Sequence, residues 1–461
     1  MFSAKTYAAR RNMLRTKIGS GIVLFPGNPL SPNNYPNNAY YFRQDSSFLY
    51  YFGLNIPSLA GLIDADTGEE ALYGDDFTVE DIIWTGPQPT LRELGAKVGI
   101  AATHPLSELE KRLRKAISLG RKIHFLPPYR GETKLWLSSL LGIKPTLLHD
   151  YKSVDLMFAV AEMREKKSAE EVEEMERAFQ IGYKMHTLAM KMCRPGVVER
   201  EIAGAIEGVA KSYGSGVSFP SIVSQHGETL HNLNADGVLE EGRLLLCDAG
   251  GETVDNYCSD HTRTYPVSGK FTQKQKDVYN IVLAAHDHVA DIVKPHMMYS
   301  EIHNAAYTTL AEGLAGIGLI KGSAADAVAA GAMTMFMPHG IGHGRARLRG
   351  DGRAELRLLL DRPTRRQVRD LHLPCGVAPR TGDGDDRRTG ALLHPGADRQ
   401  MPGRGPLQGD RRLRRPGGLP RLRRHPHRGR HPCDGKREPY AGRQEDTRHG
   451  RGARSSRRPV R

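Results

Sequence analysis

The chain has few of the features that mark secreted or membrane-spanning proteins. Its 461 residues include five cysteines and no CxxC pair, which gives no sign of a disulfide framework and favours a reduced, intracellular environment. No apolar run approaches the roughly 20 residues of a membrane span. The N-terminus also lacks the apolar segment of a secretion signal. A cytoplasmic protein is therefore the prediction.

The last quarter of the chain lacks most of the residues that build a core. After Gly344 there is no Ile, Phe, Trp or Asn, and only one Lys and one Tyr. Residues 345–461 contain 32 Lys and Arg against 13 Asp and Glu, whereas residues 1–344 contain 34 and 39. The net charge of +14 therefore belongs to this tail alone. With so few β-branched and aromatic residues, we predict an irregular, disordered tail.

Residues 1–153 read as an α/β domain. The apolar runs Ile22–Phe25, Phe48–Phe52, Ala60–Ile63 and Lys122–Leu126 are predicted strands, and Asp64–Gly68 is a predicted hairpin turn. Leu109–Leu119 has the four-residue apolar spacing of an amphipathic helix.

Residues 154–344 change in character. Ser168 is placed to cap a long helix that runs to Met192, and Pro195-Gly196 separates it from a helix over Val197–Ala210. A similar pattern, here called the echo, recurs 100 residues later. In the first copy Arg194-Pro195 precedes Glu201-Ile202, and in the second Lys294-Pro295 precedes Glu301-Ile302. Two related halves around a cleft would explain the echo, and chance similarity of two helix–break–helix units is the alternative.

Two aspartates and two histidines are the candidates for chemistry. Asp248 ends the apolar run 244–247, and Asp260 follows twelve residues later. Carboxylates at the ends of adjacent strands would repel unless a cation lay between them. A turn role for Asp248 and a capping role for Asp260 are the alternative. His339 and His343, four apart and separated by glycines, add imidazole donors that suit Mn²⁺, Fe²⁺, Co²⁺ or Zn²⁺.

These motifs together resemble a known family. The segments YFRQDSSFLY (41–50), GETLHN (227–232), DAG (248–250), SDHTRT (259–264) and HGIGH (339–343) are similar to those of the Xaa-Pro aminopeptidases (aminopeptidase P), which are pita-bread metallopeptidases. The resemblance covers nearly all of residues 1–344. It implies an α/β (α+β) fold in which an aminopeptidase P-type domain (1–153) precedes a pita-bread domain (154–344), whose two related halves would account for the echo.

The resemblance also implies roles for individual residues. Asp248, Asp260 and His343 would be metal ligands, with Asp260 bridging two divalent ions, for which Mn²⁺ is favoured over Co²⁺, Fe²⁺ and Zn²⁺. His231 and His339 would line the substrate site and stabilise the tetrahedral intermediate. The implied reaction is the release of the residue before a proline in second position, by a water that both ions activate. The implied partners are a peptide with an Xaa-Pro N-terminus and further copies of the chain as a homo-oligomer.

The family pattern breaks after the histidine motif. Two metal-binding glutamates are expected there, in a VEPG-like and a GGIRIED-like segment, but the tail has only Glu355, Glu438 and Glu445, none in such a context. A one-base shift restores both. Residues 423–431 can then encode GGIRIEDD, and residues 386–400 can encode TVEPGLYFIPALIDK. We therefore hypothesise a frameshift near Gly344, which leaves residues 345–461 out of frame and the pita-bread domain incomplete.

Three other interpretations stay open at this point. The present chain lacks both glutamates and is predicted to be inactive, whatever its descent. A prolidase, which cleaves Xaa-Pro dipeptides, would carry the same ligands. A non-catalytic pita-bread protein with a basic nucleic-acid arm is the third. Against this last one, the tail has almost no aromatic residues to stack on bases.

Overall fold

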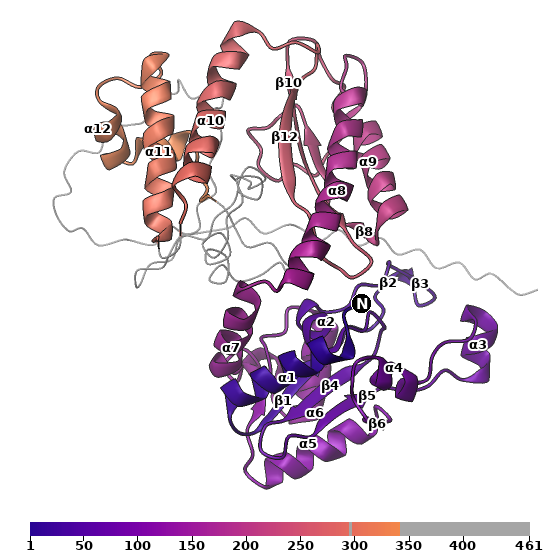
Figure 1. Ribbon diagram of the computed structural model, residues 1–461. Helices are drawn as coiled ribbons and strands as arrows, with labels where there is room; N and C mark the ends of the chain where they lie inside the picture. Colours follow the sequence, from indigo (N-terminus) through magenta and orange to yellow (C-terminus); the bar gives the residue numbers. More distant parts are fainter. Residues whose placement is uncertain (295–296, 342–461) are drawn as a thin grey trace, which may run out of the picture. The chain divides into compact units, whose positions relative to one another are not determined.

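The computed structural model describes residues 1–294 and 297–341. The predicted irregular tail and His343 lie outside these residues. The described chain begins with an α/β part and continues with two helix pairs, of which the first is followed by short strands (Figure 1). In the described residues, no helix is both long and apolar enough to cross a bilayer.

The first part is built on a five-stranded mixed sheet in the order β6-β5-β4-β1-β7. Its strands are β1 (Ile22–Pro26), β4 (Ala60–Asp64), β5 (Glu70–Tyr73), β6 (Ala102–His104) and β7 (Ile123–His124), and a small hairpin pairs β2 (Pro32–Tyr35) with β3 (Asn38–Ala39). The helices are α1 (Ala4–Ile18), α2 (Ser46–Phe52), α3 (Val79–Thr85), α4 (Leu91–Lys97), α5 (Glu108–Ser118), α6 (Gly131–Leu141), the 3₁₀ turn η1 (Pro145–Leu147) and α7 (Val154–Glu165).

Two cores cover the two faces of this sheet. Val23 and Phe25 of β1 pack with residues of α1, α2 and α7, whereas Ile22 and Leu24 pack with residues of α5 and α6. Because successive strand residues point to opposite faces, a strand buried on both sides is apolar throughout. This explains the continuous run of β1 and confirms the strand predicted from it.

The predicted strand at Phe48–Phe52 is wrong, because these residues form α2. Both Ser47 N and Phe48 N donate to the carboxylate of Asp45 at 2.9 Å, which caps the helix, and Gly53 ends it in the left-handed conformation. All seven helix residues are buried. A short apolar run buried on all sides has no period that could separate helix from strand.

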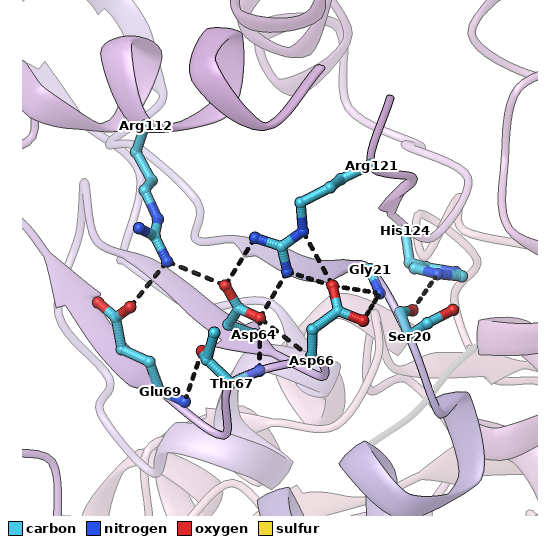
Figure 2. A network of polar contacts seen from close by, with 9 residues as sticks. All are labelled: Ser20, Gly21, Asp64, Asp66, Thr67, Glu69, Arg112, Arg121 and His124. Atoms are coloured by element: carbon cyan, nitrogen blue, oxygen red, sulfur yellow. Dashed lines mark hydrogen bonds and ion pairs between the residues drawn. The ribbon is translucent and has the colours of Figure 1, made fainter. Parts of the chain in front are cut away.

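The predicted turn Asp64–Gly68 joins β4 to β5 and carries a charged network, shown in Figure 2. Asp64 is fully buried and accepts hydrogen bonds from Arg121 and from Arg112, the latter at 3.0 Å. Burial opposes ionisation of Asp64, but the hydrogen bonds from Arg121 and Thr67 outweigh it and hold its pKa below the ordinary value. The network fastens the turn to α5 and to the start of β7.

Replacing Asp64 by Asn should lower the free energy of unfolding by about 3 kcal/mol at neutral pH, because it leaves the charges of two arginines poorly compensated. The folded-state pKa of Asp64 is lowered, so its contribution is present above about pH 4 and is lost as the pH falls through the folded pKa. Urea unfolding at neutral and acidic pH checks this. The control is Asp66→Asn: its side chain, 39% exposed, also binds Arg121, and it should cost about 1 kcal/mol or less. Equal losses for both variants would contradict the role of Asp64.

The second part begins with a helix pair packed on strands. It comprises α8 (Ala169–Met192), α9 (Glu199–Tyr213), β8 (Gly216–Val217), β9 (Ile222–Ser224), β10 (Leu244–Ala249), β11 (Gly251–Glu252) and β12 (His261–Pro266). The strands form a three-stranded sheet, β12-β10-β9, and a two-stranded one, β11-β8. Ser168 caps α8 in a capping box with Glu171, which confirms the predicted helix start.

The second helix pair repeats the first at an offset of 100 residues. It comprises α10 (Gln273–Ile292) and α11 (Tyr299–Gly316), followed by α12 (Ala324–Ala329) and the 3₁₀ turn η2 (Ala332–Met335). Buried positions recur at the offset, as the pairs Met185/Ala285, Ala189/Val289, Ile202/Ile302, Ile206/Ala306 and Ala210/Leu310. Glu201 and Glu301 also occupy the same position in the first turn of α9 and α11. Both helix–break–helix units predicted from the sequence are therefore present, and they bury residues at matching positions.

The two pairs differ in what they pack against. The core of α8 and α9 includes Leu245 and Cys247 of β10 and Tyr265 of β12. The core of α10 and α11, taken over the described residues, consists of residues from helices and loops, with none from a strand. On α10, Val282 and Leu283 are 45% and 44% exposed. The second helix pair therefore lacks, in the described part of the chain, the sheet that covers the first.

Candidate active site

The two candidate aspartates lie on one β-hairpin. Strands β10 and β12 pair antiparallel, with Asp248 opposite Thr262 and Ala249 opposite His261. The same register continues through the segment that joins the two strands. There Glu252 forms a β-bridge with Cys258, and Ser259 N donates to Gly251 O at 2.9 Å. Gly250 is therefore opposite Asp260.

This register makes Asp248 and Asp260 diagonal neighbours on the same face of the hairpin. Diagonal residues of an antiparallel pair lie roughly 7–8 Å apart, within reach of one ion or an ion pair for two carboxylates. Leu245, Cys247 and Ala249 of β10 point into the core with α8 and α9, so Asp248 lies on the opposite face. Asp248 is inside a strand and Asp260 directly precedes one, so neither residue caps a helix.

His231 lies in the loop after β9, next to a residue that is tied to the aspartate face. Ser224 of β9 is opposite Leu246, which places it on the same face as Asp248. The side chain of Asn232 donates to Ser224 Oγ at 3.0 Å, and His231 beside it is exposed. The loop that carries His231 is therefore anchored to the sheet face that carries Asp248.

His339 lies against the second helix pair. Tyr307 of α11 donates to Met337 O at 2.9 Å, and His339 Nδ1 is 3.0 Å from Gly340 O. Burial lowers the pKa of His339, and the pKa of His303 on α11 is lowered by burial and by the nearby His339. Tyr299, His303 and Tyr307, spaced four residues apart, lie on one face of α11. We did not predict a role for these residues from the sequence.

His186 connects α8 to both strands of the aspartate hairpin. Its Nε2 is 3.2 Å from Ala249 O and its Nδ1 is 2.9 Å from the hydroxyl of Tyr265. Since a carbonyl can only accept, Nε2 carries the proton and Nδ1 accepts from Tyr265. Burial lowers the pKa of His186 to about 4, so the ring is neutral at pH 7. This neutral ring holds the backbone next to Asp248 in place.

The candidate ligands are of the chemical type that binds a divalent ion, but the described residues contain too few of them in one place. Two carboxylates on one face match the oxygen donors of Mn²⁺ and related ions. However, residues 1–294 and 297–341 contain no group of three or more His, Cys, Asp or Glu placed to hold a metal. Within that part of the chain, the aspartates and His339 are therefore not gathered into one cluster.

Comparison with known proteins identifies the family. Residues 7–124 match the family model of the aminopeptidase P N-terminal domain, and residues 173–349 match metallopeptidase family M24. The Xaa-Pro aminopeptidase of Escherichia coli strain K12 is 30% identical over 356 residues, which cover 74% of this chain and 80% of that protein. The chain belongs to the Xaa-Pro aminopeptidase family.

Solved structures of family members agree in fold. Zinc-substituted Escherichia coli aminopeptidase P in complex with product superposes with a TM-score of 0.67 at 26% identity, covering 76% of this chain and 82% of that one. The Pseudomonas aeruginosa aminopeptidase PepP gives a TM-score of 0.68 at 25% identity, with 78% and 84% covered. The predicted α/β fold, with an aminopeptidase P-type domain before a pita-bread domain, is confirmed.

Membership of an Xaa-Pro aminopeptidase family makes the chain a metallopeptidase by descent. Divalent metal ions are the family's cofactor, and peptides are its substrates. The M24 match ends at residue 349, close to Gly344, where the composition changes.

One buried acidic residue of the aspartate hairpin was missed from the sequence. Glu252 is 4% exposed, although it lies between the two candidate ligands. An acidic residue among small and apolar neighbours (Ala249 to Val254) was the signal that could have identified it.

Proposed function

We propose that Asp248 and Asp260 are metal ligands of an Xaa-Pro aminopeptidase site that uses two divalent ions, with Mn²⁺ favoured. The single observation that carries this proposal is the hairpin register, which makes two carboxylates diagonal neighbours on one face. A divalent ion pair supplies Lewis acidity that lowers the pKa of a water and polarises the carbonyl before proline. Asp260, which directly precedes β12, would be the ligand shared by both ions.

The histidines take the remaining roles in this proposal. His231 and His339 line the substrate site and stabilise the tetrahedral intermediate. Burial lowers the pKa of His339, and because Gly340 O can only accept, Nδ1 carries the proton of the neutral ring, which leaves Nε2 for the substrate. His343 completes the ligands before Gly344. The substrate is a peptide with an Xaa-Pro N-terminus, and the assembly is a homo-oligomer.

We further propose that the present chain is inactive. The two glutamates expected after the histidine motif are absent from residues 345–461, so neither their ligand oxygens nor their general-base function is available. In this proposal, residues 1–153 are the aminopeptidase P-type domain, residues 154–344 are an incomplete pita-bread domain, and residues 345–461 are an out-of-frame tail. Helix α7, at the junction, packs on the first domain.

Metal binding tests the assignment of the aspartates without requiring activity. The full chain should bind Mn²⁺ weakly, and Asp248→Asn or Asp260→Asn should each weaken binding by about tenfold or more, because each removes a charged ligand oxygen. Electron paramagnetic resonance of free Mn²⁺ measures the affinity. Asp236→Asn is the control, since Asp236 forms an exposed pair with Arg200 outside the hairpin. Mn²⁺ affinity unchanged by both hairpin variants would show that the proposed site is wrong.

A further inference from the structure

The connection between the two aspartates is a tight hairpin that ends at their strands. Thr253 N donates to Tyr257 O at 2.8 Å, and the turn is closed at Asn256, whose φ of 64° is in the left-handed region. Ser259 Oγ accepts from Gly251 N at 3.0 Å. A displacement of residues 252–258 would therefore be transmitted along the ladder to Asp260.

Arg43 of the first domain contacts this hairpin. Its Nε donates to Glu252 Oε1 at 2.8 Å. The same guanidinium donates through Nη1 to Gln44 O at 3.1 Å and to Ser46 Oγ at 2.9 Å, at the start of α2. Glu252 is 4% exposed, so its carboxylate is removed from water and depends on this cation. Arg43 thus connects the start of α2 in the first domain to Glu252, the first residue after the Gly250-Gly251 pair.

A second chain of contacts reaches the same connection at Tyr257, on the side that leads to Asp260. The hydroxyl of Tyr257 donates to Glu171 Oε1 at 2.9 Å, and Glu171 pairs with Arg10 of α1 at 3.4 Å. Arg10 donates to Tyr50 O at 3.0 Å and lies 4.0 Å over the Tyr50 ring. Tyr257 is fully buried and Glu171 is 3% exposed. Arginines of the first domain therefore contact the connection at Glu252 directly, through Arg43, and at Tyr257 through Glu171 and Arg10.

We propose that Arg43, supported by Arg10, is a positioning residue that holds the hairpin so that Asp260 stays diagonal to Asp248. The first domain then contributes to the metal centre without supplying a ligand to it. The link to metal rests on the proposed function, whereas the hold on the hairpin does not. The ion pair between Arg43 and the buried carboxylate of Glu252 can hold the hairpin, because losing the guanidinium would leave Glu252 without that compensating charge.

Amide hydrogen exchange of the full chain without metal tests the hold on the hairpin. Arg43→Met should raise exchange across residues 250–260 by about tenfold or more, while the strands of the first domain stay at the parent's rates. Arg43→Lys keeps the charge and should recover part of the protection. The control Arg200→Met removes an exposed ion pair of the same half and should change nothing in this segment. Unchanged exchange in Arg43→Met would overturn the proposal.

Mn²⁺ affinity, measured on the same variants, tests the consequence for the metal centre. Arg43→Met should weaken binding by about tenfold, the range seen when outer contacts of metal sites are removed. Increased exchange with unchanged Mn²⁺ affinity would overturn the link to the metal centre. A parent chain that binds no Mn²⁺ would refute the proposed function instead, and the exchange result would still decide whether Arg43 holds the hairpin. If Arg43→Met does not fold, Glu252→Gln removes the same ion pair with little change in shape.

Discussion

A gene repaired by a one-base shift after codon 344 should encode a protein that hydrolyses Xaa-Pro peptides at least about a thousandfold faster than the present chain. The shift would restore both glutamates in the order that the family requires. It would also supply apolar residues that could cover the second helix pair, where Val282 and Leu283 of α10 are exposed. A complete ligand set and a general base each contribute several kcal/mol to the reaction. Release of the first residue from an Xaa-Pro-Xaa tripeptide, with Mn²⁺ present, is the measurement.

Two controls make this result specific. Asp260→Asn in the repaired protein should reduce the rate to that of the present chain, because repair alone cannot replace a bridging carboxylate. An Xaa-Pro dipeptide assayed beside the tripeptide separates an aminopeptidase from a prolidase. Sequencing the coding DNA from about codon 335 to the stop shows whether the shift arose in the gene or in its sequencing. DNA that stays in frame, or a repaired protein without activity, would contradict the frameshift hypothesis.

Gly250→Ala should lower the free energy of unfolding by about 3 kcal/mol or more and should also weaken Mn²⁺ binding. A Cβ at this position would overlap the backbone oxygen of Ser259 and would lie 3.1 Å from Ser218 Oγ. Because the overlapping atom is backbone, no side-chain rotation relieves the clash and the two strands must separate. Since Gly250 is opposite Asp260, separating the strands also displaces the proposed ligand. Thermal unfolding and Mn²⁺ titration of the full chain measure the two effects.

Gly204→Ala is the matched control for this variant. Gly204 lies inside α9, and no atom lies within 4 Å of the position that a Cβ would take there, so alanine should stabilise the helix by roughly 0.5–1 kcal/mol. The two variants add the same methyl group with opposite expected signs. A Gly250→Ala protein as stable as the parent would show that the hairpin backbone tolerates separation, and would weaken the argument that its geometry places Asp260.

Several features of this fold could be predicted because their signals are local. The apolar run of β1, the turn at Asp64–Gly68 and the cap at Ser168 each depend on neighbouring residues, and all three are confirmed. The similarity between residues 194–202 and 294–302 could also be recognised in the sequence, because the two helix pairs bury residues at the same spacing. The helix α2 was mispredicted, since burial on all its sides removes the periodicity that identifies a helix.

The sequence by itself determined the family, the candidate ligands Asp248 and Asp260, and the region near Gly344 in which the family pattern ends. Each is carried by residue type and spacing within a short segment. Only the tertiary structure decided that the two aspartates are diagonal on one hairpin face, that Arg43 binds Glu252 of this hairpin, and that Arg10 reaches it through Glu171. Strand register and the pairing of Glu252 with a residue 209 positions away depend on how distant segments pack. Such contacts leave no periodic trace along the chain, so no local pattern could reveal them.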